Sequence, residues 1–142
     1  MVQTIRTRRP SMTEAVVLDA SALLCLLKGE AGTQRVITVL PRAWISAVAL
    51  SEVYATLAEA GGSQHRIAQA VGGLHLRVDA FDDAQAQATG MMRPLLKAFD
   101  LSLSDHACLA LAQHRNAVAL TTQKAWSDLP KSLGITIEIL PS

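Results

Sequence analysis

The stretch AVVLDASALL, residues 15–24, places one carboxylate, Asp19, directly after a short run of apolar residues. The apolar run predicts a buried strand, and the residues after Asp19 have the apolar spacing of a helix. An acid at the end of a buried strand costs desolvation free energy unless something pairs with it. Asp19 is therefore either the N-cap of the following helix or part of a functional site, and this stretch favours the two equally.

The composition is that of one well-filled domain without an evident charge bias. Half of the 142 residues are apolar, and 13 Lys and Arg face 12 Asp and Glu. This balance neither requires nor excludes a nucleic-acid partner. Cys25 and Cys108 lack a paired motif, so we expect buried thiols and not a disulfide. No apolar run is long enough for a membrane span and no export signal is visible, which predicts a cytoplasmic protein.

We expect residues 1–12 to be an N-terminal extension that is disordered or mis-assigned, with Met12 as a possible true start. Residues 13–142 then form a single domain in which strand and helix patterns alternate. Such alternation requires crossover connections and therefore a parallel sheet with helices on both faces. The predicted fold is a three-layer α/β/α domain with a central, mainly parallel sheet of four to five strands. The strands are predicted at residues 15–19, 43–47, 76–81, 117–122 and 134–140, and one long helix, kinked at Pro94, at residues 82–99.

Two further acids follow strands of this predicted sheet. Glu52 lies in the helix after the second strand. Asp105 lies in the first turn of a later helix, for which either Ser102 or Ser104 is the expected cap. Judged singly, solvent exposure accounts for Glu52 and the helix dipole for Asp105. Together with Asp19 they sit near one sheet edge, where sites form in open parallel sheets. We expect Glu52 to be partly buried and to face Asp19.

Clustered carboxylates raise each other's pKa unless a cation neutralises them. Mg²⁺ and Mn²⁺ prefer carboxylate oxygens and water as ligands. The three acids therefore predict a site for Mg²⁺ (or Mn²⁺), which suits phosphoryl chemistry.

Four segments carry a resemblance to a known family. VVLDASALLCLLKGEAG, ISAVALSEVYATL, LSLSDHACLALA and VALTTQKAW resemble the signature segments of the PIN-domain family, and more narrowly of VapC-type toxins from bacterial toxin–antitoxin pairs. The resemblance implies a PIN-like fold and a metal-dependent ribonuclease that a VapB-like antitoxin silences. By that match Asp19, Glu52 and Asp105 take the places of the catalytic, metal-binding acids, and Ser21 supports the first of them.

The chain departs from the family pattern at Gln123, where an acid is usual, and at Ser104, where glycine is usual. The loss of one negative charge should weaken cation binding. Thr121, Thr122 and Gln123 are expected to support the carboxylates. The alternative function is accordingly a catalytically weakened PIN domain that binds RNA or a partner.

The remaining expectations concern partners and packing. RNA is the expected substrate, and a cognate antitoxin and a second copy of the chain are the expected protein partners. Part of the apolar helix surface should form their contact face, and the alternative is that all of it belongs to the core. We interpret His106 as a solvated helix residue and Trp126 as a packing residue. The contact face is predicted to draw on Leu23, Leu27, Val36, Leu40, Val53 and Leu57.

Overall fold

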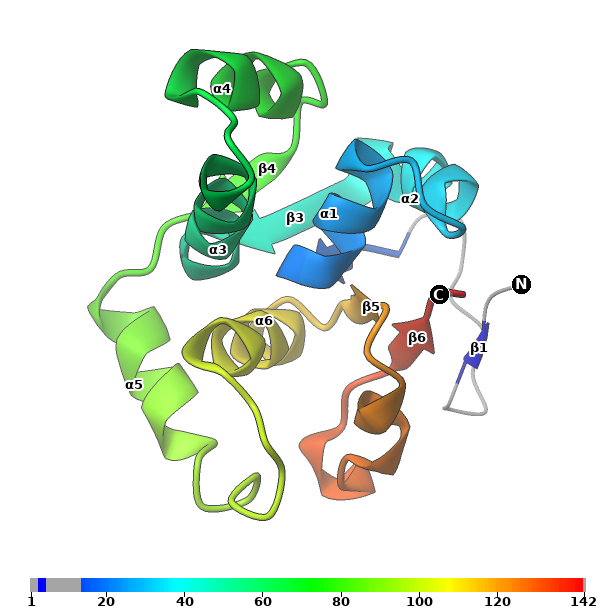
Figure 1. Ribbon diagram of the computed structural model, residues 1–142. Helices are drawn as coiled ribbons and strands as arrows, with labels where there is room; N and C mark the ends of the chain where they lie inside the picture. The colour runs from blue at the N-terminus through cyan, green and yellow to red at the C-terminus, as the bar shows by residue number, and fades with distance from the viewer. Residues whose placement is uncertain (1–2, 5–13, 142) are drawn as a thin grey trace.

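The sheet is centred on β2 (Val16–Leu18), the strand that precedes Asp19. The computed structural model describes residues 3–4 and 14–141 and arranges the strands in the order β1-β6-β5-β2-β3-β4 (Figure 1). Five strands are parallel, and β1 pairs with β6 in the antiparallel sense. The other strands are β1 (Gln3–Thr4), β3 (Ala43–Ser46), β4 (Arg77–Asp79), β5 (Val118–Thr121) and β6 (Ile137–Ile139).

Helices cover both faces of this sheet, which confirms the predicted three-layer fold (Figure 1). Val16 and Leu18 point into a core shared with α1 (Ala20–Leu27), α2 (Thr33–Val39) and α3 (Ala47–Glu59). Val17 points into a second core on the opposite face, where it meets α6 (Leu103–His114). This division follows from the alternation of side chains along a strand.

The outer helices and short turns complete the layers. α4 (Gln64–Gly72) contacts α3, and α5 (Asp83–Met91) contacts α6. Three 3₁₀ turns, η1 (Leu40–Arg42), η2 (Lys124–Asp128) and η3 (Lys131–Leu133), connect the elements around β3, β5 and β6. No helix within the described residues is long and apolar enough to cross a membrane.

The prediction of one long helix over residues 82–99 is wrong. Helix α5 ends at Met91, and a series of turns follows up to Phe99. Pro94 has no N–H to donate to the carbonyl of Gly90, and its ring would clash with that carbonyl. The residue before a proline is also disfavoured in helical conformation. The proline therefore ends the helix before its own position instead of kinking it.

The N-terminal extension falls mostly outside the described residues, so its disorder stays a prediction. Within it, Gln3 and Thr4 pair with Ile139 and Glu138 of β6. This short antiparallel strand was not expected from the sequence.

Most of the apolar helix surface assigned to partners belongs to the core. Leu23, Val36 and Val53 are fully buried, which contradicts their assignment to a contact face. Leu27, Leu40 and Leu57 are half-buried against the same core. Cys25 and Cys108 are buried free thiols, as predicted. Among the side chains that the structure describes, the large apolar ones that remain exposed are Ile37, Val78, Met91, Leu95 and Leu103.

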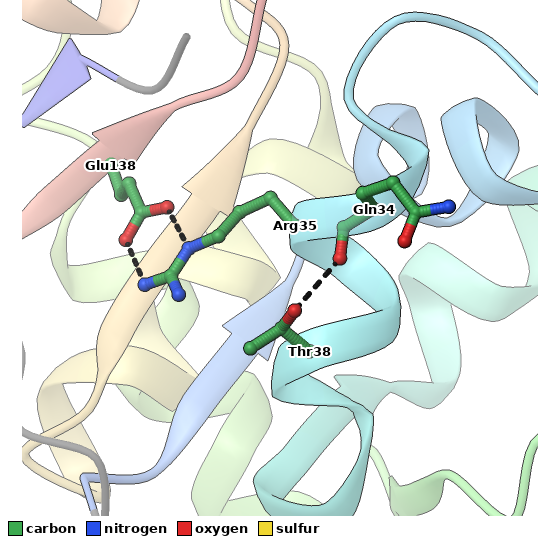
Figure 2. Close-up of polar contacts among 4 residues, drawn as sticks. All are labelled: Gln34, Arg35, Thr38 and Glu138. Atoms are coloured by element: carbon green, nitrogen blue, oxygen red, sulfur yellow. Dashed lines mark hydrogen bonds and ion pairs between the residues drawn. The ribbon is translucent and has the colours of Figure 1, made fainter.

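A bidentate ion pair fastens α2 to β6. Arg35 donates from Nε and Nη2 to the two carboxylate oxygens of Glu138, at 2.7 and 2.9 Å (Figure 2). The Glu138 side chain is 3% exposed and that of Arg35 is 27% exposed. The hydrogen bond to Glu138 raises the pKa of Arg35 further above its ordinary value. The paired geometry offsets the cost of burying the Glu138 charge.

Replacing Arg35 by methionine is expected to lower the free energy of unfolding by about 3 kcal/mol, because Glu138 would keep a buried charge without its cation. Urea unfolding measures this loss. Arg66→Met is a control that removes the same charge from an exposed site on α4 and should change stability by less than about 0.5 kcal/mol. Equal stability of the two variants would contradict a structural role for the pair.

Candidate functional site

Asp19 lies at the carboxyl end of β2 and is completely buried. Its Oδ1 accepts hydrogen bonds from the backbone N–H of Ala22 at 2.8 Å and from the hydroxyl of Ser21 at 2.7 Å. Its Oδ2 accepts from the hydroxyl of Thr121 at 2.5 Å and from Nε2 of Gln123 at 3.1 Å. Asp19 therefore caps α1 with one oxygen and leaves the other in a polar cluster at the sheet edge.

Register explains why these groups meet. Leu18 of β2 pairs with Leu120 of β5, so the residues that follow them, Asp19 and Thr121, are neighbours at the same edge. Burial raises the pKa of Asp19, and the hydrogen bonds from Thr121, Ser21, Ala22 and Gln123 lower it in part. A buried carboxylate held by four donors is oriented, and it gains from any further positive charge.

Asp105 reaches the same cluster from the first turn of α6. Its Oδ2 accepts from the backbone N–H of Ser102 at 3.0 Å, and its own N–H donates to the Ser102 hydroxyl at 3.1 Å. This reciprocal pair is a capping box, and it identifies Ser102 as the cap of α6. Ser104 does not cap the helix, and within the described residues its buried hydroxyl has no hydrogen-bond partner. The other Asp105 oxygen, Oδ1, is left to face Gln123.

Gln123 joins the two acids. Its Nε2 donates to Oδ2 of Asp19 at 3.1 Å and to Oδ1 of Asp105 at 2.9 Å. Because both oxygens bond to one nitrogen atom, they cannot be farther apart than the sum of these two distances. Two oxygens bound to one Mg²⁺ at about 2.1 Å lie at most about 4.2 Å apart, so a shared cation requires the two carboxylates to sit closer than this upper bound.

Ser21 and Thr121 support Asp19 through their hydroxyl groups, as expected. The Ser21 hydroxyl also accepts from the backbone N–H of Thr122 at 2.9 Å, and that of Thr121 accepts from the N–H of Gln123 at 3.0 Å. Thr122 thus contributes through its backbone. The hydroxyls tie residues 121–123 to the Asp19 carboxylate.

Glu52 does not have the expected burial. The buried residues of α3 are Ala49 and Val53, and Glu52 lies outside this narrow stripe with its side chain exposed. In the part of the chain that the structure describes, no three acidic, histidine or cysteine side chains form a group able to hold a metal ion. The structure therefore brings Asp19 and Asp105 together without a third acid.

A pocket of about 440 Å³ opens beside α6, one residue from Asp105 along the helix. His106 lines it and is buried, contrary to the expectation of a solvated residue. Its ring Nδ1 lies 2.8 Å from the Ser102 carbonyl, which can only accept, so Nδ1 carries the proton. The other lining residues, which include two cations and one aromatic ring, are Gly90, Arg93, Pro94, Leu96, Lys97, Phe99 and Leu101.

The donor set suits a hard cation in part. Mg²⁺ and Mn²⁺ bind oxygen ligands together with water. The site offers one carboxylate oxygen each from Asp19 and Asp105, and it would offer the amide oxygen of Gln123 if that amide rotated to exchange its nitrogen and oxygen. Asp19, Asp105 and Gln123 are the residues that would hold such an ion.

Comparison with known proteins identifies the family. The PIN domain family matches residues 16–132, so the chain belongs to the PIN domain family. A comparison with curated protein sequences finds no match.

Solved structures with the same fold include chains of VapBC complexes. One is VapBC2 from Rickettsia felis bound to a promoter DNA fragment, with 16% identity, a TM-score of 0.68, and coverage of 89% of this chain and 98% of that chain. DNA-bound VapBC from Salmonella typhimurium has 25% identity, a TM-score of 0.67, and coverage of 87% and 96%. FitAcB from Neisseria gonorrhoeae has 17% identity, a TM-score of 0.65, and coverage of 86% and 95%.

Proposed function

We propose that this chain is a Mg²⁺- or Mn²⁺-dependent ribonuclease and the toxin of a toxin–antitoxin pair. The observation that carries the proposal is the convergence of the Asp19 and Asp105 carboxylates on one point at the carboxyl edge of the sheet. Membership of the PIN domain family and the fold shared with chains of VapBC complexes support it.

Each residue has a defined part in this proposal. A bound divalent cation would lower the pKa of water and neutralise charge on the phosphate. Asp19 and Asp105 hold the ion, and Ser21 and Thr121 keep the Asp19 carboxylate in one orientation. The exposed Glu52 is suited to act through water and not as a direct ligand.

Incubation of purified protein with RNA and with DNA tests the activity. We expect RNA cleavage in Mg²⁺ or Mn²⁺, none in EDTA, and intact DNA. The alternative of a weakened PIN domain that only binds RNA or a partner is favoured by Gln123 and by the exposure of Glu52. It predicts uncleaved RNA in every condition, with RNA or a protein partner bound.

The pocket beside α6, which His106 lines, is a suitable place for the RNA chain. Arg93 and Lys97 would contact phosphates, and Phe99 would contact a base. The double variant Arg93→Gln/Lys97→Gln is expected to raise the Kd for RNA about tenfold and to weaken its salt dependence, measured by fluorescence anisotropy. Arg66→Gln/Lys131→Gln removes the same charge from exposed positions elsewhere and serves as the control. If the two double variants bind RNA with equal affinity, the pocket does not bind the RNA chain.

A ribonuclease active in the cytoplasm requires an inhibitor. We propose a VapB-like antitoxin as that partner, with an Arg that pairs with Asp19 or Asp105. A homodimer is proposed through exposed apolar side chains such as Met91, Leu95 and Leu103. Co-expression with the neighbouring reading frame should yield a complex by pull-down and restore growth. A chain that is active alone and tolerated by its host would contradict the toxin role.

A further inference from the structure

The Gln123 side chain occupies the place between two carboxylates where a cation would otherwise be needed. Its single Nε2 contacts Asp19 at 3.1 Å and Asp105 at 2.9 Å. An ionised carboxylate only accepts hydrogen bonds, so the NH₂ end of the amide, and not its oxygen, must face the two acids. Each of its two hydrogens can serve one acid, and the amide carries no charge.

The backbone around Gln123 holds the amide in this position. The N–H of Gln123 donates to the Thr121 hydroxyl, and the N–H of Thr122 donates to the Ser21 hydroxyl. Both hydroxyls also donate to Asp19. Three residues later, the fully buried Trp126 fixes the chain against the core. The amide is therefore placed by the same contacts that orient Asp19.

Removal of this amide would leave two buried acids facing each other without the hydrogen-bond donor that joins them. Burial and mutual repulsion both disfavour that state. A metal-free site that lacked such a bridge would destabilise the fold.

We infer that Gln123 is an internal substitute for the cation, and that the same residue becomes a metal ligand when its amide turns over. Rotation about the last side-chain bond exchanges Nε2 for Oε1 at nearly the same point. Metal binding must then break two hydrogen bonds to charged acceptors before it gains one oxygen ligand. The inference rests on the metal site of the proposed function and adds its regulation: the apo protein is stable, and the site fills only at a higher divalent-ion concentration.

Thermal unfolding of three proteins, each in EDTA and in Mg²⁺, tests this inference without any measurement of activity. In EDTA, Gln123→Met, which keeps the length but loses the amide, should melt below the wild type, and Gln123→Glu, which adds a third carboxylate, should melt lowest. Mg²⁺ should raise the melting temperature of Gln123→Glu most and that of the wild type least. The Kd of Mg²⁺ should be at least about tenfold lower for Gln123→Glu than for the wild type, because affinity follows ligand charge.

Gln113→Glu is the matched control. Its Nε2 donates to the backbone carbonyl of Leu133 at 3.0 Å, away from the acids. This variant should respond to Mg²⁺ as the wild type does. A Gln123→Glu protein that folds only in Mg²⁺ supports the inference. A Gln123→Met protein as stable as the wild type in EDTA, or an equal response of all variants to Mg²⁺, overturns it.

NMR of the wild type gives a second measurement that needs no variant. The side-chain NH₂ signals of Gln123 should shift during a Mg²⁺ titration and exchange faster with water as their hydrogen bonds open. Unchanged signals at saturating Mg²⁺ would overturn the inference. If the protein cleaves RNA but Mg²⁺ raises the melting temperature of all variants equally, the inference about Gln123 is refuted and the proposed ribonuclease activity is not. If the melting temperatures respond to Mg²⁺ as predicted but the protein does not cleave RNA, the proposed ribonuclease activity is refuted and the inference about Gln123 is not.

Discussion

Asp19→Asn is expected to leave the protein folded and to reduce RNA cleavage by more than about 100-fold. Loss of a group that only supports a metal ligand typically costs 10- to 100-fold, so loss of the ligand itself should exceed that range. The asparagine retains Oδ1 for Ala22 and Ser21, and a neutral side chain is less costly to bury. The initial rate of RNA cleavage in Mn²⁺ measures the loss of activity, and a urea unfolding curve shows whether the variant is folded.

Asp82→Asn is the control for this substitution. Asp82 caps α5 by accepting from the N–H of Gln85 at 2.9 Å, but it is exposed. Asparagine is an equally good cap, so stability and activity should both stay close to the wild type. A folded Asp19→Asn protein that cleaves RNA within a few-fold of the wild-type rate would exclude Asp19 from catalysis.

Trp126→Ala is expected to cost about 3–5 kcal/mol of the free energy of unfolding, the range for a fully buried aromatic residue. Trp126 is 0% exposed and lies in the core with Leu129, Leu133 and Ile137. Total stabilities of single domains are only about 5–15 kcal/mol, so this variant should be largely unfolded in mild urea.

Trp126→Phe is the matched variant. It keeps an aromatic ring and removes an indole N–H that has no hydrogen-bond partner within the described residues, so its loss should be smaller. Equilibrium unfolding in urea compares the two variants. Near wild-type stability of Trp126→Ala would contradict the packing role.

The fold was accessible from the sequence because apolar strands alternate with helical patterns. Val16 to Leu18 form a strand buried on both faces, which a short apolar run indicates. The placement of Asp19 and Asp105 at one edge followed from their positions after strands or at a helix start.

The details of the candidate site could not be predicted, because they depend on contacts between residues that are distant in the sequence. The bridge from Gln123 to two acids needs the register of β2 with β5 and the docking of α6, which no local pattern encodes. The signal that marked Gln123 was its departure from the family pattern. The exposure of Glu52 depends on how α3 turns against its neighbours, and the choice of Ser102 over Ser104 as the cap depends on one turn of backbone.

The most direct test of the central claim is the identity of the RNA ends that the purified protein produces. Attack by water with departure of the 3′ oxygen leaves a 5′-phosphate and a 3′-hydroxyl, and it should require Mg²⁺ or Mn²⁺. We predict these ends, with label from isotopically labelled water in the 5′-phosphate, and no products in EDTA. Cyclic 2′,3′-phosphate ends formed in EDTA would contradict a metal-dependent site built on Asp19 and Asp105.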